Sequence, residues 1–335
     1  MANKEELFIL GAGFSYAVTN GTMPLLNGLT KELLDDLELE EEENLARIWN
    51  DYVINPNIGN VQDPAHSNFE DIMTFLSSKF AYETYQDEHL KAALYQYITE
   101  RIVAIFQMIN LEKEISNDHY LLQFAKYLHR TKADVFSFNY DLVLENLLLR
   151  IPDSVDNFKP LYVVKKMSSS YEGMVLFDEG YYFWQNSLKL YKLHGSINWM
   201  YDPDYPTGVQ IVTSKTLPEY YKGLHYLLVP PTILKNFVFK NTLLDIQWQE
   251  FREKLQLAKK IFIIGYSIPK TDIATYYALK TCVQPNCQVY IVAKKPTEDK
   301  IKEWEQLFDR QNKQHYLHIL KEGFNENTCR SMGCI

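Results

Sequence analysis

Short apolar segments that alternate with helical patterns constrain the fold of this chain more than any other feature. Strand patterns are expected at 7–10, 134–138, 188–193, 261–264, 288–292 and 315–320. Helical patterns separate many of them, at 142–150, 243–259, 272–281 and 297–308. Several strand segments are apolar throughout, which indicates a parallel sheet that is covered on both faces. The sequence therefore predicts an α/β fold.

Two insertions interrupt this alternation. The pattern from about 24 to 130 is helical, so we expect a helical insertion after the first strand. The segment from about 152 to 223 is rich in tyrosine and broken by Gly and Pro, which favours short strands and loops. Since α/β proteins often use this length for one elaborated unit, we expect a single domain over 1–335. Its expected form is a Rossmann-like, mostly parallel sheet with helices on both faces.

Charge and composition narrow the classes of partner. The chain has 34 Lys and Arg against 43 Asp and Glu, a formal net charge of −9, which disfavours direct contact with nucleic acid. Its first residues are polar and charged, and its apolar runs are far shorter than the roughly 20 residues of a membrane helix. We therefore expect a cytoplasmic protein without a membrane partner.

The four cysteines form two pairs of equal spacing, Cys282 with Cys287 and Cys329 with Cys334. A four-thiolate zinc site is conceivable, but the Cys-x-x-Cys spacing typical of such sites is absent. We expect reduced thiols, as in a cytoplasmic protein, and no metal.

A glycine turn, Gly11-Ala12-Gly13-Phe14-Ser15, follows the first strand segment. Two glycines let a backbone approach a pyrophosphate closely, and the amides at a helix start attract its charge. The common dinucleotide fingerprint has a third glycine where this chain has Tyr16, which argues against an ordinary dehydrogenase. A simple tight turn is the alternative interpretation.

Polar residues follow the second and third strand segments, where a parallel sheet binds its ligands. Asn139 and Asp141 follow the second, and His194 with Gly195 follows the third. The Asn139 amide can both donate and accept hydrogen bonds. Asp141 could simply cap the next helix, and His194 could be a structural hydrogen-bonding residue.

The segment after 261–264 reads Gly265-Tyr266-Ser267-Ile268-Pro269, and Asp272 follows. Gly265 would let a ligand reach the backbone, and Ser267 could bond a hydroxyl. The alternative is a helix start that is capped by Ser267 or Asp272.

Taken in order, the glycine turn, Asn-Tyr-Asp, Leu-His-Gly-Ser and Gly-Tyr-Ser-x-Pro resemble the sirtuin-like NAD-binding family. The closer resemblance is to the sirtuin-like NAD hydrolases of bacterial anti-phage defence. The similarity covers 7 to about 292, and 24–130 is its least diagnostic part. Protein-deacylating sirtuins carry a Cys-x-x-Cys zinc module after the histidine, whereas this chain has no cysteine between His194 and Cys282.

The resemblance implies an NAD glycohydrolase that cleaves the bond between nicotinamide and ribose and depletes NAD during abortive infection. Asn139 and His194 would be catalytic. The cofactor-binding residues carried over are Gly11, Ala12, Gly13, Phe14, Ser15, Asp141, Gly195, Gly265 and Ser267. Lys294 and Lys295 stand where many relatives have an asparagine before a proline, so the resemblance does not define the adenine contacts.

Nicotinamide leaves as a neutral molecule, so the resemblance implies hydrolysis without an acid for the leaving group, unlike most glycosidases. His194 would accept a proton from water or a ribose hydroxyl, and Asn139 would orient the ribose and the water. NAD is thus expected as substrate. A homo-oligomer or a separately encoded regulatory protein is the expected partner, because no sensor domain is recognisable. The alternatives are a non-catalytic NAD or ADP-ribose sensor and a protein ADP-ribosyltransferase.

Overall fold

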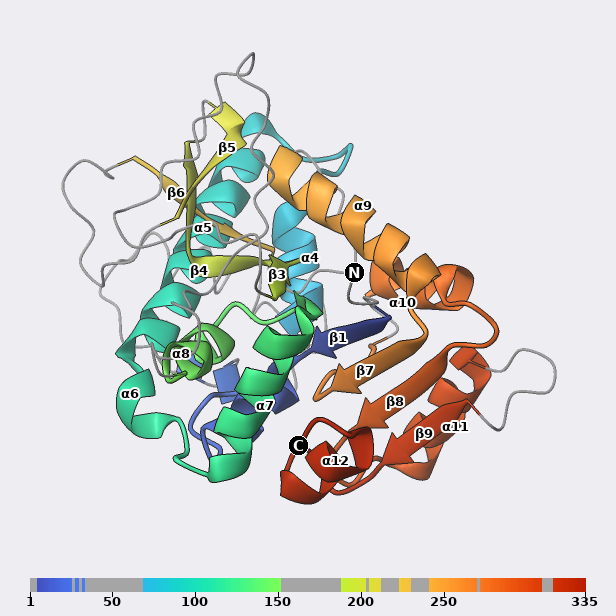
Figure 1. The fold of residues 1–335 in the computed structure, drawn as a ribbon. Helices are drawn as coiled ribbons and strands as arrows, with labels where there is room; N and C mark the ends of the chain where they lie inside the picture. The colour runs from blue at the N-terminus through green and yellow to red at the C-terminus, as the bar shows by residue number, and fades with distance from the viewer. Residues whose placement is uncertain are drawn as a thin grey trace, which may run out of the picture.

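The computed structural model of the 335-residue chain describes residues 5–25, 28–29, 32–33, 69–151, 188–202, 205–211, 223–229, 241–269, 272–308 and 316–335 (Figure 1). Each statement below concerns these ranges.

A six-stranded parallel sheet forms the centre of the molecule. Its strands are β1 (Glu6–Leu10), β2 (Asp134–Ser137), β3 (Lys189–Lys192), β7 (Lys260–Ile264), β8 (Gln288–Val292) and β9 (Leu317–Leu320). They lie in the order β3-β2-β1-β7-β8-β9. Numbered along the chain within this sheet, the order is 3-2-1-4-5-6, that of the Rossmann fold. The predicted fold class is confirmed, and β1 and β7 flank the point where the strand order reverses.

Helices cover both faces of this sheet (Figure 1). The helices are α1 (Ala12–Val18), α4 (Phe69–Ser77), α5 (Tyr85–Met108), α6 (Leu111–Glu114), α7 (His119–Thr131), α8 (Val143–Leu149), α9 (Thr242–Leu257), α10 (Ile273–Cys282), α11 (Glu298–Phe308) and α12 (Glu326–Met332). Leu7 and Ile9 share a core cluster with residues of α9, α10 and α11. Phe8 and Leu10 face the other cluster, to which α1, α5, α7, α8 and α12 contribute. Within the described ranges, no helix has both the length and the apolar character needed to cross a bilayer.

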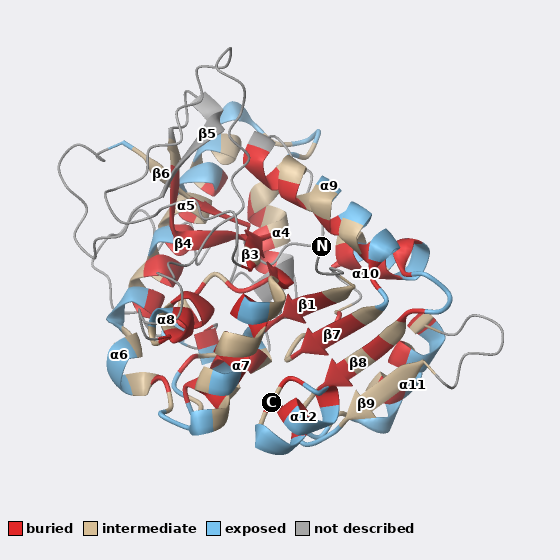
Figure 2. Cartoon of the chain, viewed as in Figure 1, coloured by how far each residue is buried: buried red, intermediate tan, exposed pale blue. Residues whose placement is uncertain are grey.

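Burial explains why the central strands read as continuous apolar runs. Residues 7–10 of β1 and 261–264 of β7 are at most 2% exposed. Both strands are drawn largely in red, the colour of buried residues, in Figure 2. Each fully buried aliphatic or aromatic side chain contributes about 1.5–3 kcal/mol of transfer free energy. These two strands therefore hold the switch point rigidly against the helices of both faces.

A second, three-stranded antiparallel sheet lies beside the first. It consists of β4 (Gly195–Asp202), β5 (Tyr205–Ile211) and β6 (His225–Leu228), in the order β5-β4-β6. Only two residues separate β3 from β4, so the chain passes directly from one sheet to the other at His194. Gly195 has a φ of +74°, and a Cβ on it would lie 1.9 Å from the carbonyl oxygen of Leu227. This close approach admits only glycine at the junction.

The described part of the predicted helical insertion at 24–130 contains α4, α5, α6 and α7. Much of its first half, including 34–68, lies outside the described residues, as does 152–187 of the predicted aromatic-rich insertion. The sequence gives no clear signal for the short helix α12, whose start is defined by a capping box between Asn325 and Thr328.

The four cysteines are buried and unpaired with one another. Cys282 and Cys287 belong to the core cluster on one face of the sheet, and Cys329 and Cys334 to the cluster on the other. A four-thiolate site is therefore incompatible with their positions. Elsewhere among the described residues, no three His, Cys, Asp or Glu side chains converge as metal ligands would.

Candidate functional site

A cavity of about 1210 Å³ opens at the carboxyl edge of the parallel sheet. It extends from the ends of β2 and β3, across the switch point between β1 and β7, to the ends of β8 and β9. Ligands of doubly wound sheets bind at this edge and at this switch point. The volume exceeds the roughly 300–1,000 Å³ of sites for small ligands, so a dinucleotide has room.

The glycine turn forms the floor of the cavity at the switch point. The N–H of Gly11 donates to the carbonyl of Ile264 at 3.0 Å, and that of Gly13 donates to the carbonyl of Gly265 at 2.8 Å. A Cβ on Gly13 would lie 2.9 Å from the Cα of Gly265, and one on Gly265, whose φ is +64°, would lie 2.1 Å from the nitrogen of Phe14. These glycines therefore allow the start of α1 to pack directly on the end of β7.

This packing explains how the chain tolerates Tyr16 in place of a third glycine. Tyr16 is 36% exposed and lines the cavity instead of pressing on the sheet. Gly265, from a distant part of the sequence, provides the close helix–strand contact that the third glycine provides in the common fingerprint.

Asn139 is held in one orientation by the glycine turn. Its Nδ2 donates to the carbonyl of Gly11 at 3.0 Å and to the Oγ of Ser15 at 2.9 Å. Both amide hydrogens are thus used within the protein. The side chain is 8% exposed and lines the cavity, so the amide oxygen remains as its acceptor for a ligand.

Asp141 continues this hydrogen-bonded chain. Its carboxylate accepts a hydrogen bond from the Ser15 hydroxyl and another, at 2.9 Å, from the N–H of Val143. Burial raises the pKa of the Asp141 carboxyl above its ordinary value of 3.8, although the nearby Lys192 and these hydrogen bonds oppose the shift. Asp141 is not the N-cap of α8, which is Leu142, but it accepts the N–H of Val143, the first residue of that helix. It also lines the cavity.

Lys192 holds the main chain at Asp141 in place beside α8. It is 1% exposed, and its Nζ donates to the carbonyl of Asp141 at 2.5 Å and lies 3.0 Å from Glu145 Oε1. A buried charge needs such a partner, because an unpaired one costs several kcal/mol. The ion pair joins the end of β3 to α8 and fixes the backbone beside Asn139.

His194 lies at the junction of the two sheets and faces a carboxylate. Its Nε2 is 3.7 Å from Asp272 Oδ2, which also accepts a hydrogen bond at 2.5 Å from the Tyr266 hydroxyl. The imidazole packs edge-on against Phe138 at 4.9 Å between ring centroids, and the Tyr266 ring stacks on Phe138 at 4.4 Å. Since the His194 side chain is 10% exposed, the protein determines its orientation.

The structure brings most of the predicted site residues to this one cavity. They are Gly11, Ala12, Gly13, Asn139, Asp141, His194, Gly265 and Ser267. Phe14, Ser15 and Gly195 do not line it. Phe14 packs against Phe124 and Phe324, Ser15 bridges Asn139 to Asp141, and Gly195 forms the sheet junction. Whether the lining residues bind a cofactor stays a prediction.

Sequence reasoning missed the partners of these residues. The sequence predicts for Asp272 only a helix cap, and it does cap α10 through the N–H of Thr275. Its second role depends on a contact with a residue 78 positions earlier, which no local pattern encodes. Lys192 is the last residue of β3, and no local signal marks its pairing with Glu145.

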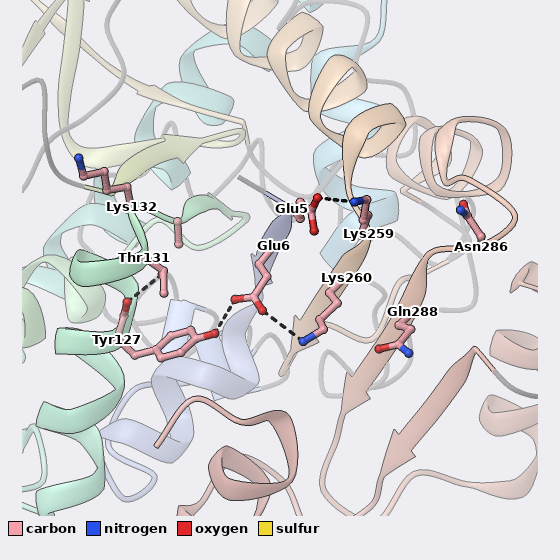
Figure 3. A pocket seen from close by; sticks show the side chains of 10 residues that line it. Glu5, Glu6, Tyr127, Thr131, Lys132, Lys259, Lys260, Asn286 and Gln288 are labelled. Atoms are coloured by element: carbon pink, nitrogen blue, oxygen red, sulfur yellow. Dashed lines mark hydrogen bonds and ion pairs between the residues drawn. The ribbon is translucent and has the colours of Figure 1, made fainter. Parts of the chain in front are cut away.

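A second cavity, of about 540 Å³, lies at the opposite, amino edge of the sheet (Figure 3). Four of its charged groups, Glu5, Glu6, Lys259 and Lys260, are paired with one another. Glu6 accepts a hydrogen bond from the Tyr127 hydroxyl at 2.5 Å and lies 3.4 Å from Lys260, and Glu5 pairs with Lys259. We therefore place the candidate site at the carboxyl edge.

Comparison with models of known protein families and with curated proteins finds no match to this chain.

Proposed function

We propose that this chain is an NAD glycohydrolase, which hydrolyses NAD to nicotinamide and ADP-ribose. The observation that carries the proposal is that Asn139 and His194, 55 positions apart in the sequence, line the same cavity as the glycine turn. The motif order that resembles sirtuin-like NAD hydrolases of anti-phage defence supports the same activity, with NAD depletion during infection as its biological outcome.

In this proposal, NAD crosses the switch point with its pyrophosphate beside Gly11, Ala12 and Gly13. The nicotinamide riboside lies toward Asn139 and His194. Gly265 and Ser267 contact the adenosine half.

Hydrolysis breaks the bond between the nicotinamide nitrogen and C1′ of the ribose. The electron pair leaves with nicotinamide, which becomes neutral, so no general acid is needed at the leaving group. Water forms the new bond to C1′ and loses a proton to His194, whose neutral imidazole can act as a base. The sum of these steps is NAD⁺ and water giving nicotinamide, ADP-ribose and a proton.

Asn139 orients the reacting groups, and Asp272 supplies a negative charge beside His194. The Asn139 amide, fixed through Gly11 and Ser15, offers its oxygen to a ribose hydroxyl or to the attacking water. The Asp272 carboxylate, 3.7 Å from His194, favours the imidazolium that forms when the base takes its proton. No metal enters this mechanism.

The direct test is to incubate the purified chain with NAD and measure nicotinamide and ADP-ribose. Asn139→Ala and His194→Ala should each lower the rate about 100- to 10,000-fold, the usual contribution of a positioned base or orienting group. Asn146→Ala on α8 and His318→Ala on β9 are matched controls outside the cavity and should retain activity.

Three results would contradict the proposal. Nicotinamide release that survives both cavity substitutions would exclude Asn139 and His194 as the reacting groups. NAD that is bound but recovered intact, even with a regulatory partner present, would indicate a sensor. Label that appears on protein in place of free ADP-ribose would indicate ADP-ribosyl transfer. The activity is also expected to depend on self-assembly or on a separately encoded regulatory protein. Light scattering of the chain, with and without that protein, measures whether either assembly forms.

A further inference from the structure

The β8–β9 end of the cavity carries a group of lysines, which we call the lysine rim: Lys294, Lys295 and Lys300. Lys294 and Lys295 follow β8 after one intervening residue, Ala293, and are exposed, and Lys300 lies in the first turn of α11. Glu322 is the acidic residue at the same end. Lys300 is paired with Glu303, so Lys294 and Lys295 stand against Glu322 and leave this end of the cavity locally basic in a chain with a net charge of −9.

Main-chain hydrogen bonds hold the rim in place. The N–H of Ala293 donates to the carbonyl of Leu320 at 3.0 Å, that of Lys295 to Lys321 at 2.9 Å, and that of Gly323 to Ala293 at 3.1 Å. Lys295 has a φ of +48°, which is uncommon for a residue other than glycine. Such backbone conformations persist where the surrounding structure imposes them, and they concentrate at ligand sites.

Lys294 and Lys295 differ in their pairing from Lys300, the third lysine of the rim, and from Lys192. Lys192 is neutralised by Glu145, and Lys300 lies 2.9 Å from Glu303 while it donates to the carbonyl of Ile268 at 3.3 Å. Among the described residues, Lys294 and Lys295 have no acidic partner. Their ammonium groups are available to an anion that enters the cavity.

We propose that Lys294 and Lys295 form a phosphate subsite for the 2′-phosphate of the adenosine ribose, so that the cavity accepts NADP in addition to NAD and binds NADP more tightly. The inference rests on the proposed function. With the scissile bond at Asn139 and His194 and the pyrophosphate at the switch point, the adenosine ribose lies one strand further along, at β8. Neighbouring strands are about 4.8 Å apart, which places the rim beside that ribose.

The competing interpretation concerns Glu322. Sites that select NAD use a carboxylate to bind the ribose hydroxyls, whereas a cationic side chain accommodates a 2′-phosphate. Two unpaired lysines against one carboxylate favour the phosphate, because a phosphate monoester carries about −1.5 to −2 charges at neutral pH.

Binding of two nucleotide fragments to the full chain tests the subsite without requiring catalysis. The probes are adenosine 2′,5′-bisphosphate and AMP, which differ only in the 2′-phosphate. Isothermal titration calorimetry should give a dissociation constant about tenfold lower for the bisphosphate, since each exposed ion pair contributes modestly. The ratio should shrink as salt rises, because the rim is open to solvent.

The variant Lys294→Ala/Lys295→Ala should lose the preference while its affinity for AMP is unchanged. Lys321→Ala, an exposed lysine of the adjoining turn outside the cavity, should retain the preference. Equal affinities in the wild-type chain, a preference that survives the double substitution, or no binding of either fragment would each overturn the subsite. The nicotinamide assay with NAD is independent of these results, so failure of the subsite is distinguishable from failure of the proposed function.

Discussion

At the scale of single residues, Asp272 connects the helix scaffold to the candidate base. One carboxylate caps α10, accepts the Tyr266 hydroxyl and faces His194. A carboxylate beside a histidine orients the ring and favours its protonated form. Asp272 is therefore a positioning residue for the proposed reaction, whereas His194 is the group that meets the water.

Asp272→Asn should lower the rate of NAD hydrolysis about 100-fold, within the range found for acid–base assistance. The amide preserves the shape of the side chain and can still cap α10. The acid limb of the pH–rate profile should also move to lower pH, because the charge that favours the protonated imidazole is gone.

Tyr266→Phe is the matched control for this substitution. It removes one hydrogen bond to the same carboxylate and keeps the negative charge beside His194. We expect a smaller loss of rate and an unchanged pH profile. If Asp272→Asn leaves the pH–rate profile unchanged, Asp272 does not act on His194 and serves only as the cap of α10.

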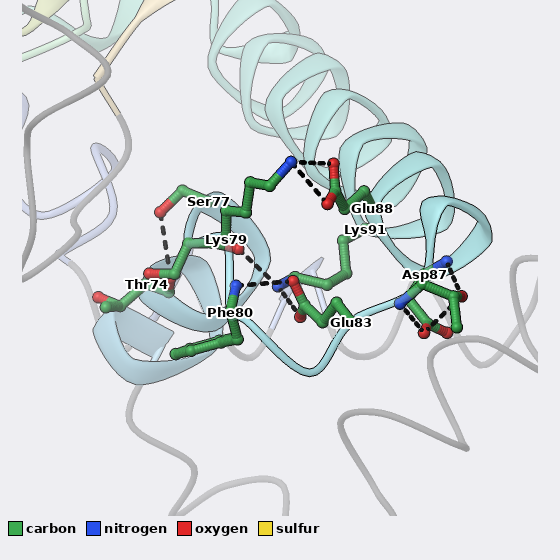
Figure 4. Close-up of polar contacts among 10 residues, drawn as sticks. Thr74, Ser77, Lys79, Phe80, Glu83, Asp87, Glu88 and Lys91 are labelled. Atoms are coloured by element: carbon green, nitrogen blue, oxygen red, sulfur yellow. Dashed lines mark hydrogen bonds and ion pairs between the residues drawn. The ribbon is translucent and has the colours of Figure 1, made fainter.

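At the scale of elements, the turn from α4 to α5 depends on one buried lysine (Figure 4). Lys91 is 2% exposed, pairs with Glu83 and donates to the carbonyl of Ser78 at 2.6 Å. Its ammonium also lies 4.6 Å from the ring centre of Phe75 and 4.7 Å from that of Phe80. This single cation therefore neutralises Glu83, satisfies the carbonyl of Ser78 and lies against two aromatic rings of the turn.

The pKa of Glu83 reports on the same pair. Burial raises it, but the hydrogen bonds from Lys91 and from the N–H of Phe80 outweigh burial, and the pKa lies below its usual 4.5. A carboxylate with a lowered folded-state pKa stabilises the fold above its usual pKa and loses that contribution as the pH falls.

Lys91→Met should lower the free energy of unfolding by about 3 kcal/mol at neutral pH, because the Glu83 charge loses its partner. Lys79→Met, which breaks the exposed Lys79–Glu88 pair of the same turn, should cost less than about 1 kcal/mol. Urea unfolding at pH 7 and pH 4 measures both. The Lys91 effect should shrink at pH 4, and an effect as small as that of Lys79 would contradict the assigned role.

At the scale of the whole molecule, the four thiols report on the integrity of both faces of the sheet. All are buried, and burial raises the pKa of Cys287 and of Cys329 to about 12. Thiolate is the reactive form, so little of either residue reacts near pH 8 while the protein is folded.

Alkylation at pH 8 should therefore modify the four cysteines slowly in the native chain and completely in urea. The protection of both pairs should be lost together at the urea concentration that unfolds the sheet, since the same strands contribute to both core clusters. Mass spectrometry of peptides that contain each pair measures this. Rapid modification of the native chain would contradict the burial.

The strand and helix patterns by themselves determined the α/β class, the parallel sheet and the carboxyl edge as the place for a site. This was possible because local periodicity and the strand-end rule need no knowledge of distant contacts. The small antiparallel sheet and α12 carried weaker patterns. The sequence singles out Asn139 and His194 because each directly follows a predicted strand segment, and both line the cavity.

Only the tertiary structure decided what these residues contact. The pairing of Asp272 with His194, the support of Asn139 by Gly11 and Ser15, and the packing of Gly265 on Gly13 all join segments that are far apart in the chain. In the structure, Phe14, Ser15 and Gly195 do not line the cavity, contrary to the prediction. Lys294 and Lys295 do line it. The physical reason is that the direction of a side chain at a strand end depends on the neighbouring strands, and the order of those strands is a property of the whole sheet.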